Sequence, residues 1–379
     1  MTAPARARPS WVALAALPAV NLTVALALSA VVVLLGGENP LRALRVLASG
    51  AFGDAESIGY TLYYATNFVF TGLAVAVAFH ASLFNIGAEG QAYIGGLGVA
   101  LLCLGAGAWP QLLVIPAAVV VAAAAGAAWA FLPGWLQARR GSHVVITTIM
   151  FNFIASALMT YLLVNVLIKP GQQSPETREF APNTWLPQLQ DAAGWLGGRL
   201  GHSPLNLSSL LALLAGVLVW FYLWHTRWGY ELRALGHNET AAVYGGIPPA
   251  RTVIAVMAIS GGLAGLMSLN DVMGAQHRLL MNFPGGAGYV GIAVALMGRN
   301  HPVGIGLAAI LFGALYQGGS ELSFDMPKLN RDMVVVIQGL IILVCGALEY
   351  ALRGPVEALC RRMAPSGREW ASIRPGHAE

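Results

Sequence analysis

Charged residues are scarce in this sequence. Aspartate, glutamate, lysine and arginine make up 10% of its 379 residues, and hydrophobic residues make up 57%, whereas soluble domains carry about 25% charged residues. A chain this apolar has too little polar surface to face water on all sides, which excludes an ordinary soluble domain. The net charge of +4 comes from arginines scattered among loops, which is not the clustered basic face of a nucleic-acid partner.

Lysine is almost absent. Lys169 and Lys328 are the two lysines of the chain, and neither follows a glycine-rich loop. A P-loop needs such a lysine to reach the β- and γ-phosphates of ATP, so this chain does not hydrolyse ATP by that route. HExxH, GxSxG and paired Cys/His motifs are also missing, so we expect no enzyme activity, no metal site and no cofactor on this chain.

Three cysteines are too few for a disulfide framework or a zinc site at their spacing. Cys103 and Cys345 fall in apolar runs, and Cys360 lies in the polar C-terminal tail. We interpret them as small apolar filler.

Long apolar runs are what the sequence has in abundance. Runs of this length cross the roughly 30 Å of hydrocarbon in a bilayer as helices, so we predict an all-α polytopic membrane protein, a single transmembrane domain over residues 1–379. About ten transmembrane helices are expected, at 11–35, 57–79, 92–106, 109–133, 143–168, 205–224, 252–270, 287–299, 302–320 and 333–350. Glycine is also frequent, with 45 residues, which is typical of closely packed membrane helices.

Arginine placement predicts the orientation. With the N-terminus 1–10 in the cytoplasm, 13 of the 21 basic residues fall in cytoplasmic segments, as the positive-inside rule requires. Residues 169–204 then form an external loop, and residues 225–251 form a cytoplasmic loop. The tail 351–379 is cytoplasmic. In the cytoplasmic loop, residues 231–244 have helix-forming composition, and GGIPP ends that helix.

Two glycine-rich segments predict an internal repeat. FNIGAEGQAYIGGLGVALL at 84–102 and FPGGAGYVGIAVALM at 283–297 share a leading phenylalanine, a glycine cluster and a tyrosine. They open the third and the eighth span, so the copies are inverted relative to each other. Inverted repeats with interrupted helices are typical of transporters. The alternative is chance similarity between two glycine-rich membrane segments.

Ionisable residues are rare within the predicted spans. His80, Glu89, Asp271 and Glu321 fall near span ends. Ion-coupled transporters and proton pumps place such groups inside the membrane, so their scarcity argues against ion coupling.

Four motifs carry a resemblance to a known family. FNIGAEGQ at 84–91, RALGHNETAAVYGGI at 233–247 and GIAVALMGRNHPVG at 291–304 resemble the permeases of the ribose, branched-chain amino acid and nucleoside ABC importers. Together with VVITTIMFNFI at 144–154, the first motif looks closest to nucleoside permeases of the guanosine type. The resemblance covers the chain from about the second to the tenth span.

The resemblance implies a permease subunit in the cytoplasmic (inner) membrane, with a translocation path for nucleosides or related simple sugars. It implies a cytoplasmic ABC ATPase that hydrolyses ATP, an external solute-binding protein and a second, similar permease that completes the pore as a heterodimer. Membrane lipid surrounds the chain, and nucleic acid is not a partner.

The family's coupling helix, which docks into a groove of the ATPase, resembles residues 233–247. The residues that match are Arg233, Gly236, Asn238, Glu239, Ala241, Ala242 and Gly246. The small alanine pair suits a helix that enters a protein groove. The alternative is a solvated loop helix.

Amide and carboxyl groups at the interrupted spans are candidates for the solute path. A nucleoside offers ring nitrogens and hydroxyls, which suit amide partners, and aromatic rings stack on bases. The candidates are Asn85, Glu89, Gln91, Asn152, Asn270 and Phe283. The alternative is that these groups bond to neighbouring helix ends and hold the breaks together, and that Phe283 simply packs.

Two rival functions remain at this stage. An ion-coupled secondary transporter of a small polar solute agrees with the inverted repeat but not with the scarce membrane carboxylates. A membrane-embedded enzyme or assembly protein has no motif in its favour. The sequence does not distinguish nucleosides from ribose-like sugars or purine-like compounds, nor a homodimeric pore from a heterodimeric one.

Overall fold

The computed structural model is built of helices. It describes residues 17–169, 171–192, 203–326, 328–329, 333–340 and 343–344. Among them there is no β-strand, and two isolated bridges pair Glu176 with Leu280 and Gln188 with Asn206. The chain divides into two units, residues 1–40 with 335–379, and residues 41–334.

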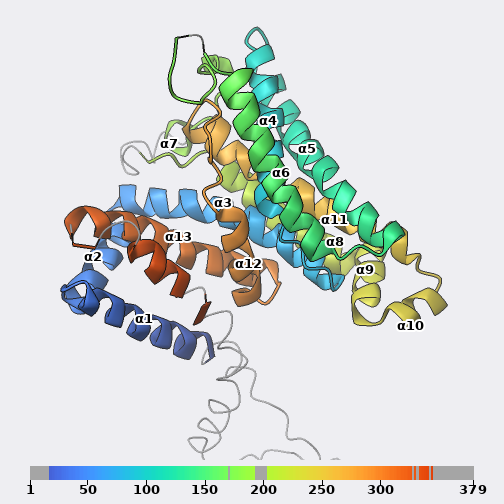
Figure 1. The fold of residues 1–379 in the computed structure, drawn as a ribbon, viewed down its shortest axis with the longest axis horizontal. Helices are drawn as coiled ribbons and strands as arrows, with labels where there is room; N and C mark the ends of the chain where they lie inside the picture. Colours follow the sequence, from blue (N-terminus) through green and yellow to red (C-terminus); the bar gives the residue numbers. More distant parts are fainter. Residues whose placement is uncertain are drawn as a thin grey trace, which may run out of the picture. The chain divides into compact units, whose positions relative to one another are not determined.

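Helix α1 (Leu17–Leu35) belongs to the first unit. The second unit holds the remaining described elements (Figure 1). They are α2 (Pro40–Phe52), α3 (Ala55–His80), α4 (Ala88–Gly105), α5 (Gln111–Arg140), α6 (Val144–Asn165), the 3-10 turn η2 (Pro182–Thr184), α7 (Leu189–Ala192), α8 (Ser208–His225), α9 (Arg227–His237), α10 (Glu239–Tyr244), α11 (Pro249–Leu266), the π-helix η3 (Leu269–Ala275), α12 (Ala287–Met297) and α13 (Pro302–Asp325).

Six segments are long and apolar enough to cross a membrane: α3, α5, α6, α8, α11 together with η3, and α13. They confirm the spans predicted at 57–79, 109–133, 143–168, 205–224, 252–270 and 302–320. A seventh span results if α1 and α2 are one broken span. The segment predicted at 92–106 is helix α4, and that at 287–299 is the short apolar helix α12. Of the span predicted at 333–350, residues 333–340 and 343–344 are described and helical, and the others lie outside the described residues.

Helix α2 was not predicted. It begins at Pro40, and proline is favoured at the first position of a helix because its missing N–H has no partner there. Its inner face is made of small residues, of which Gly50 lies against Glu321 and Gly318 of α13. The helix is short, at 13 residues, and carries Arg42 and Arg45, so it has no apolar run long enough to be predicted as a span.

Glycines bring α5 and α11 into direct backbone contact. A side chain at Gly126 or Gly261 would overlap with the backbone of the other helix, and Gly265 lies against Ala122 and Gly126. Because these residues lack a Cβ, the two backbones approach closely, as small residues allow in membrane bundles. We call this contact the α5–α11 seam (Figure 1).

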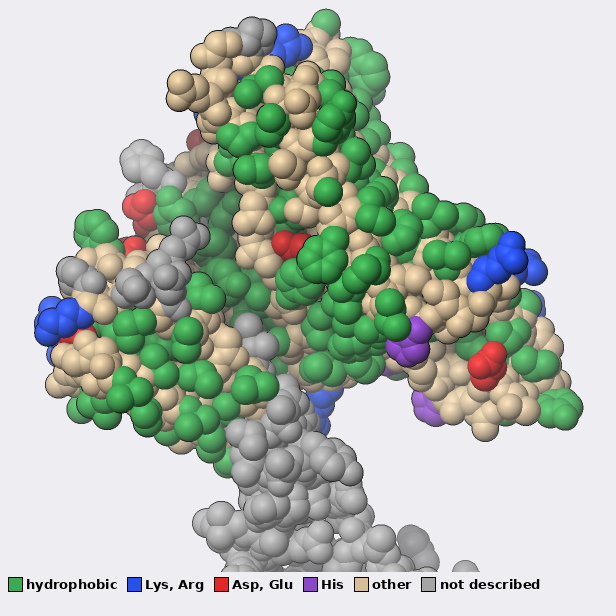
Figure 2. Space-filling model, in the orientation of Figure 1, with side chains coloured by type: hydrophobic (Ala, Val, Ile, Leu, Met, Phe, Trp, Pro, Cys, Tyr) green, Lys and Arg blue, Asp and Glu red, His purple; other side chains and the backbone are tan. Residues whose placement is uncertain are grey.

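Helix α3 forms the centre of the second unit. Residues 73–78 in its C-terminal part are fully buried, and it contacts α8, α11, α12 and α13. The outer helices instead expose apolar side chains, such as Phe153 of α6 and Leu213 of α8. Figure 2 shows hydrophobic side chains predominating over the visible face of α4 to α6. Apolar side chains on the outer surface as well as in the interior fit a bundle surrounded by lipid.

The two interrupted spans start in similar ways. α3 ends at His80, a non-helical stretch follows, and α4 begins at Ala88 after Gly87. α11 and η3 end at Ala275, and α12 begins at Ala287 after Gly286. Gly286 has a φ of 87°, a left-handed conformation that glycine adopts without strain. The local sequence therefore permits this turn into α12.

Candidate functional site

The polar side chains of segment 84–91 bond to one another. The Asn85 amide nitrogen donates to the Gln91 side-chain oxygen at 3.0 Å and to the Ser260 hydroxyl at 2.8 Å. The Asn85 oxygen accepts from the Gln91 amide at 3.1 Å and from the Gly87 N–H at 2.9 Å. Both amides are buried. These bonds stabilise the turn between α3 and α4.

The Glu89 carboxylate lies at the N-terminus of α12. One oxygen accepts from the Gly286 N–H at 2.9 Å, and the other accepts from the Gly288 N–H at 2.8 Å. Glu89 is 6% exposed. A helix N-terminus has free N–H groups and a partial positive charge, so it stabilises a buried carboxylate.

Asn152 connects α6 to both interrupted spans. Its side-chain oxygen accepts from the Gly90 N–H at 2.9 Å. Its nitrogen donates to the Ile86 carbonyl at 2.9 Å and to the Tyr289 hydroxyl at 3.2 Å. The structure thus brings together Asn85, Glu89, Gln91 and Asn152, four of the six predicted path residues.

Phe283 packs against α4. Its ring is 5.7 Å from the Tyr93 ring in an edge-on arrangement, and it occupies the space where a side chain at Gly96 would lie. The Tyr93 hydroxyl donates to the Asn282 side-chain oxygen at 2.8 Å. We call the contact between residues 84–96 and residues 282–289 the break junction.

Asn270 belongs to a separate cluster at the end of α11. Its nitrogen donates to the Tyr63 carbonyl at 3.0 Å and to the Asn67 side-chain oxygen at 2.8 Å. Its oxygen accepts from Asn206 at 3.0 Å and from the Ser208 hydroxyl at 2.7 Å. Every polar atom of this buried side chain has a protein partner.

Asp271 was placed near a span end by the sequence but is buried inside the bundle. Its carboxylate accepts from the Asn67 amide at 3.1 and 3.2 Å and from the Tyr63 hydroxyl. It lies in η3, and π-helical turns are frequent at functional sites. Sequence reasoning missed Tyr63 and Asn67. Their spacing of four residues on one helix face was the available signal.

The cytoplasmic loop of the prediction contains two helices instead of one. Asn238 is extended, with φ −161° and ψ 108°, and separates α9 from α10. Its side chain accepts from the Ala241 N–H at 3.0 Å, and asparagine is a favoured N-cap. The single helix expected over 231–244 was therefore wrong, because composition alone did not reveal the cap.

The predicted coupling residues divide into an exposed and a packed set. Asn238, Glu239, Ala241 and Gly246 are exposed. Ala242 is buried against Leu235 and Ile247, and Arg233 is partly buried and donates to the Gly229 carbonyl at 3.4 Å. The alanine pair therefore does not present a common surface.

Gly236 joins the α9–α10 hairpin to the end of α3. A side chain there would overlap with the His80 carbonyl, and the Gly236 carbonyl accepts from the Ser82 hydroxyl at 2.6 Å. The hairpin is thus attached beside the turn that leads into α4. Sequence reasoning identified Gly236 but not this contact.

Tyr244 is the most exposed apolar residue of the hairpin, at 89%, and Val243 beside it is 52% exposed. The sequence argument treated Tyr244 and Ile247 alike, whereas the structure buries Ile247 within the hairpin. These two adjacent exposed side chains are accessible to a partner surface.

The loop 171–192 covers the other end of α11. Its backbone bonds to the segment after η3, from Thr177 N–H to the Leu279 carbonyl at 3.1 Å and from Phe180 N–H to the His277 carbonyl at 2.8 Å. Trp185 stacks on His277 at 4.0 Å, and burial lowers the pKa of this histidine. The loop is therefore an ordered cover.

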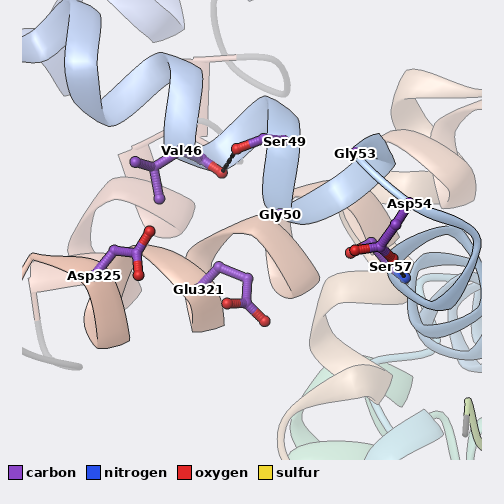
Figure 3. A pocket seen from close by; sticks show the side chains of 8 residues that line it. All are labelled: Val46, Ser49, Gly50, Gly53, Asp54, Ser57, Glu321 and Asp325. Atoms are coloured by element: carbon purple, nitrogen blue, oxygen red, sulfur yellow. Dashed lines mark hydrogen bonds between the residues drawn. The ribbon is translucent and has the colours of Figure 1, made fainter.

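An open recess of about 350 Å³ lies between α2, the start of α3 and the end of α13 (Figure 3). Asp54, Glu321 and Asp325 are among its lining residues. The Asp54 carboxylate accepts from the Ser57 N–H at 2.7 Å, which lowers the pKa of this aspartate. Asp54 thus has a structural role, as the N-cap of α3.

Membrane transport is the class of function that this arrangement defines. Interrupted apolar helices place backbone and amide groups inside a bundle of apolar helices, an arrangement that is typical of transporters. A family model described as the permease component of the branched-chain amino acid transport system matches residues 57–346. The chain belongs to this family of ABC importer permeases.

Three relatives extend the similarity over nearly the whole chain. The guanosine ABC transporter permease of Bacillus subtilis is 35% identical and covers 89% of this chain and 94% of its own length. The nucleoside permease of Lactococcus lactis is 32% identical, with 86% and 88% covered. The glucose permease of Haloferax volcanii is 31% identical, with 92% and 91% covered. A second, less similar permease of B. subtilis and of L. lactis also matches, at 28% and 26% identity. The comparison with solved structures gave no match.

Membership of this family confirms the expectations on function, cofactor, location and two of the partners. The chain is a multi-pass permease subunit of an ABC importer in the cytoplasmic membrane, and it is not an enzyme. It carries no cofactor, because the ATPase subunit hydrolyses the ATP. An ATPase and a solute-binding protein are its partners. The ion-coupled alternative has no support among the relatives.

Proposed function

We propose that this permease imports nucleosides of the guanosine type. The observation that carries the proposal is its similarity, over nearly full length, to permeases that are named for guanosine and for nucleosides. The amide-rich break junction supports it, because amides are good partners for ring nitrogens and hydroxyls. The glucose permease among the relatives favours a simple sugar as the second candidate.

Uptake by the complete importer tests this function. With the ATPase, the second permease and the solute-binding protein in proteoliposomes, we expect guanosine uptake that requires ATP on the ATPase side. Uptake should continue when a protonophore collapses the proton gradient, since the ATPase supplies the energy. Unlabelled guanosine should compete and glucose should not. Uptake driven by a proton or sodium gradient alone would contradict the proposal.

The solute path is proposed to run along the break junction and the Asn270 cluster. Asn85, Glu89, Gln91, Asn152, Asn270 and Phe283 would border it. All five polar side chains bond to protein groups in this structure. In this proposal they exchange some of these bonds for bonds to solute during transport.

Ten membrane crossings and an inverted repeat remain proposals. When the two segments are aligned at Phe84 and Phe283, Gly87 matches Gly286 and Ala88 matches Ala287. The next pair, Glu89 and Gly288, is in contact. Contact between matching positions is what a two-fold axis between the copies would produce, which supports the repeat.

The proposed topology places loop 169–204 outside and loop 225–251 in the cytoplasm, with residues 1–10 and 351–379 also cytoplasmic. The two termini and residues 193–202 lie outside the described residues. Loop 171–192 and the α9–α10 hairpin are attached near opposite ends of α11, which supports their placement on opposite sides.

Cysteine labelling checks this topology. In a background with the three native cysteines replaced, a cysteine in place of the exposed Ser174 should react with an impermeant maleimide on intact cells. A cysteine in place of the exposed Thr240 should react only in inverted vesicles. The opposite pattern would overturn the proposed orientation.

The pore is proposed to be a heterodimer with a second permease. The pairs of similar permeases in B. subtilis and L. lactis support this composition. The α9–α10 hairpin is proposed to dock on the ATPase. Glu239, Ala241 and Asn238 would face the groove, joined by Tyr244, while Arg233, Gly236 and Ala242 would hold the hairpin in shape and Gly246 would turn the chain towards α11.

A further inference from the structure

The two interrupted spans are held to each other by one carboxylate. Glu89 is the second residue of α4, yet both of its oxygens bond to the first N–H groups of α12. In the described part of the chain its hydrogen-bond partners are these two backbone amides and not a basic side chain. The pairing of this buried charge therefore depends on α12 being in place.

Gly288 shows how close the contact is. A Cβ at this position would lie 2.6 Å from the Glu89 Cα and 2.8 Å from the Ala88 carbonyl carbon. Both distances are shorter than real Cβ contacts, so glycine is required here. The Tyr93–Asn282 bond and the ring of Phe283 extend the contact along α4. The break junction is thus closed, with its polar groups paired across it.

Opening this junction without solute is costly. If α12 moves away from α4, the Glu89 carboxylate loses both charge-assisted hydrogen bonds in a poorly solvated site. A solute with N–H and O–H donors, such as a nucleoside, replaces the lost amides. An empty junction has no such replacement, so its opening is disfavoured.

We propose that Glu89 is a positioning residue that keeps the break junction closed until solute donors replace the α12 amides, and that this couples ATP hydrolysis to solute. The proposal rests on the proposed function, since it assigns the junction to the solute path. Its role differs from that of a simple solute contact, because the carboxylate acts on α12 in the absence of solute.

The decisive measurement is the rate of ATP hydrolysis without the solute-binding protein, which we call the receptor. In the purified complex in nanodiscs, Glu89→Gln keeps the size of the side chain but leaves one oxygen to accept from one amide. Loss of one charge-assisted bond should raise ATP hydrolysis without receptor by about tenfold. Glu89→Ala should raise it at least as far, and Tyr93→Phe less, because it removes a neutral bond. The amount of solute taken up per ATP hydrolysed should fall most in Glu89→Ala and Glu89→Gln and least in Tyr93→Phe.

Glu179→Gln is the matched control. It makes the same change at an exposed carboxylate of the external loop, and its receptor-independent rate should equal that of the wild type. Unchanged receptor-independent rates in Glu89→Gln and Glu89→Ala would overturn the proposal. So would a changed KM for uptake with an unchanged basal rate, which indicates a solute contact, or failure of Glu89→Gln to assemble, which indicates a structural role alone.

The outcome is independent of the solute assignment. If guanosine-loaded receptor fails to stimulate the wild-type complex, the proposed solute is wrong, but the comparison of receptor-independent rates still tests the junction. If guanosine stimulates the wild type and Glu89→Gln has the wild-type basal rate, the solute assignment stands and the role of Glu89 falls.

Discussion

Replacing Gly261 with leucine should prevent the permease from accumulating in a folded form. Gly261 lies in the α5–α11 seam, where a side chain would overlap with Ala130 and the Gly126 backbone. Four added carbon atoms cannot fit between two helix backbones, and overpacking of this kind costs about 3 kcal/mol or more. Such a cost is a large share of a folded protein's usual stability of about 5–15 kcal/mol. Size-exclusion profiles of a fluorescent fusion report the folded fraction.

Gly216→Leu is the matched control for this prediction. Gly216 lies in α8 and has no atom within 4 Å of a built Cβ, so leucine has room there. Both variants add the same apolar side chain to a membrane helix. A difference between them therefore does not come from insertion of the helix into the membrane. A monodisperse Gly261→Leu protein with the wild-type melting temperature would show that the seam is not as close as the structure has it.

Replacing Ala241 with tryptophan should abolish transport while leaving the permease folded. Ala241 is exposed on α10, and its backbone bond to Asn238 does not involve its side chain. In the proposed docking of α10, a tryptophan at this position would obstruct the entry of the helix into the groove of the ATPase. Overpacking of about 1–3 kcal/mol weakens ATPase binding by about five- to 150-fold. Co-purification of the ATPase, with permease expression as the reference, measures the loss directly.

Two companion variants separate docking from folding. Ala242→Trp should damage the hairpin itself, because Ala242 is buried against Leu235 and Ile247. Ala124→Trp adds the same bulk at an exposed position of α5 and should keep the ATPase. If Ala241→Trp retains the ATPase and normal uptake, residues 233–247 are not the docking segment.

The long spans could be predicted because their signal is local. Helices α3, α5, α6, α8 and α13 are continuous apolar runs, and a run of about 20 such residues indicates a membrane helix without any knowledge of its neighbours. α2 gave no such signal, since it is short, at 13 residues, and carries Arg42 and Arg45. The break at Asn238 depends on one side-chain cap, which composition does not report.

The candidate residues could be named from the sequence, but their partners could not. Asn85 and Asn152 stood out as polar residues in apolar surroundings. Their bonds connect the segment before α4 with α11, and α6 with the start of α12. Bonds of the candidate residues to other elements join residues 62 to 207 positions apart, and a single sequence contains no measure of that proximity. The same distance in sequence hid the contact of Asp271 with Tyr63 and Asn67.

The α5–α11 seam limits which helices of this subunit can move relative to each other. Two helices whose backbones touch through glycine have no layer of side chains between them to change rotamer, so neither can slide or rotate along the other without a clash. We therefore expect the two helices to move as one rigid unit. The rearrangements of a transport cycle then belong to other contacts, and labels placed on these two helices keep a constant separation against which every other displacement in the subunit can be measured.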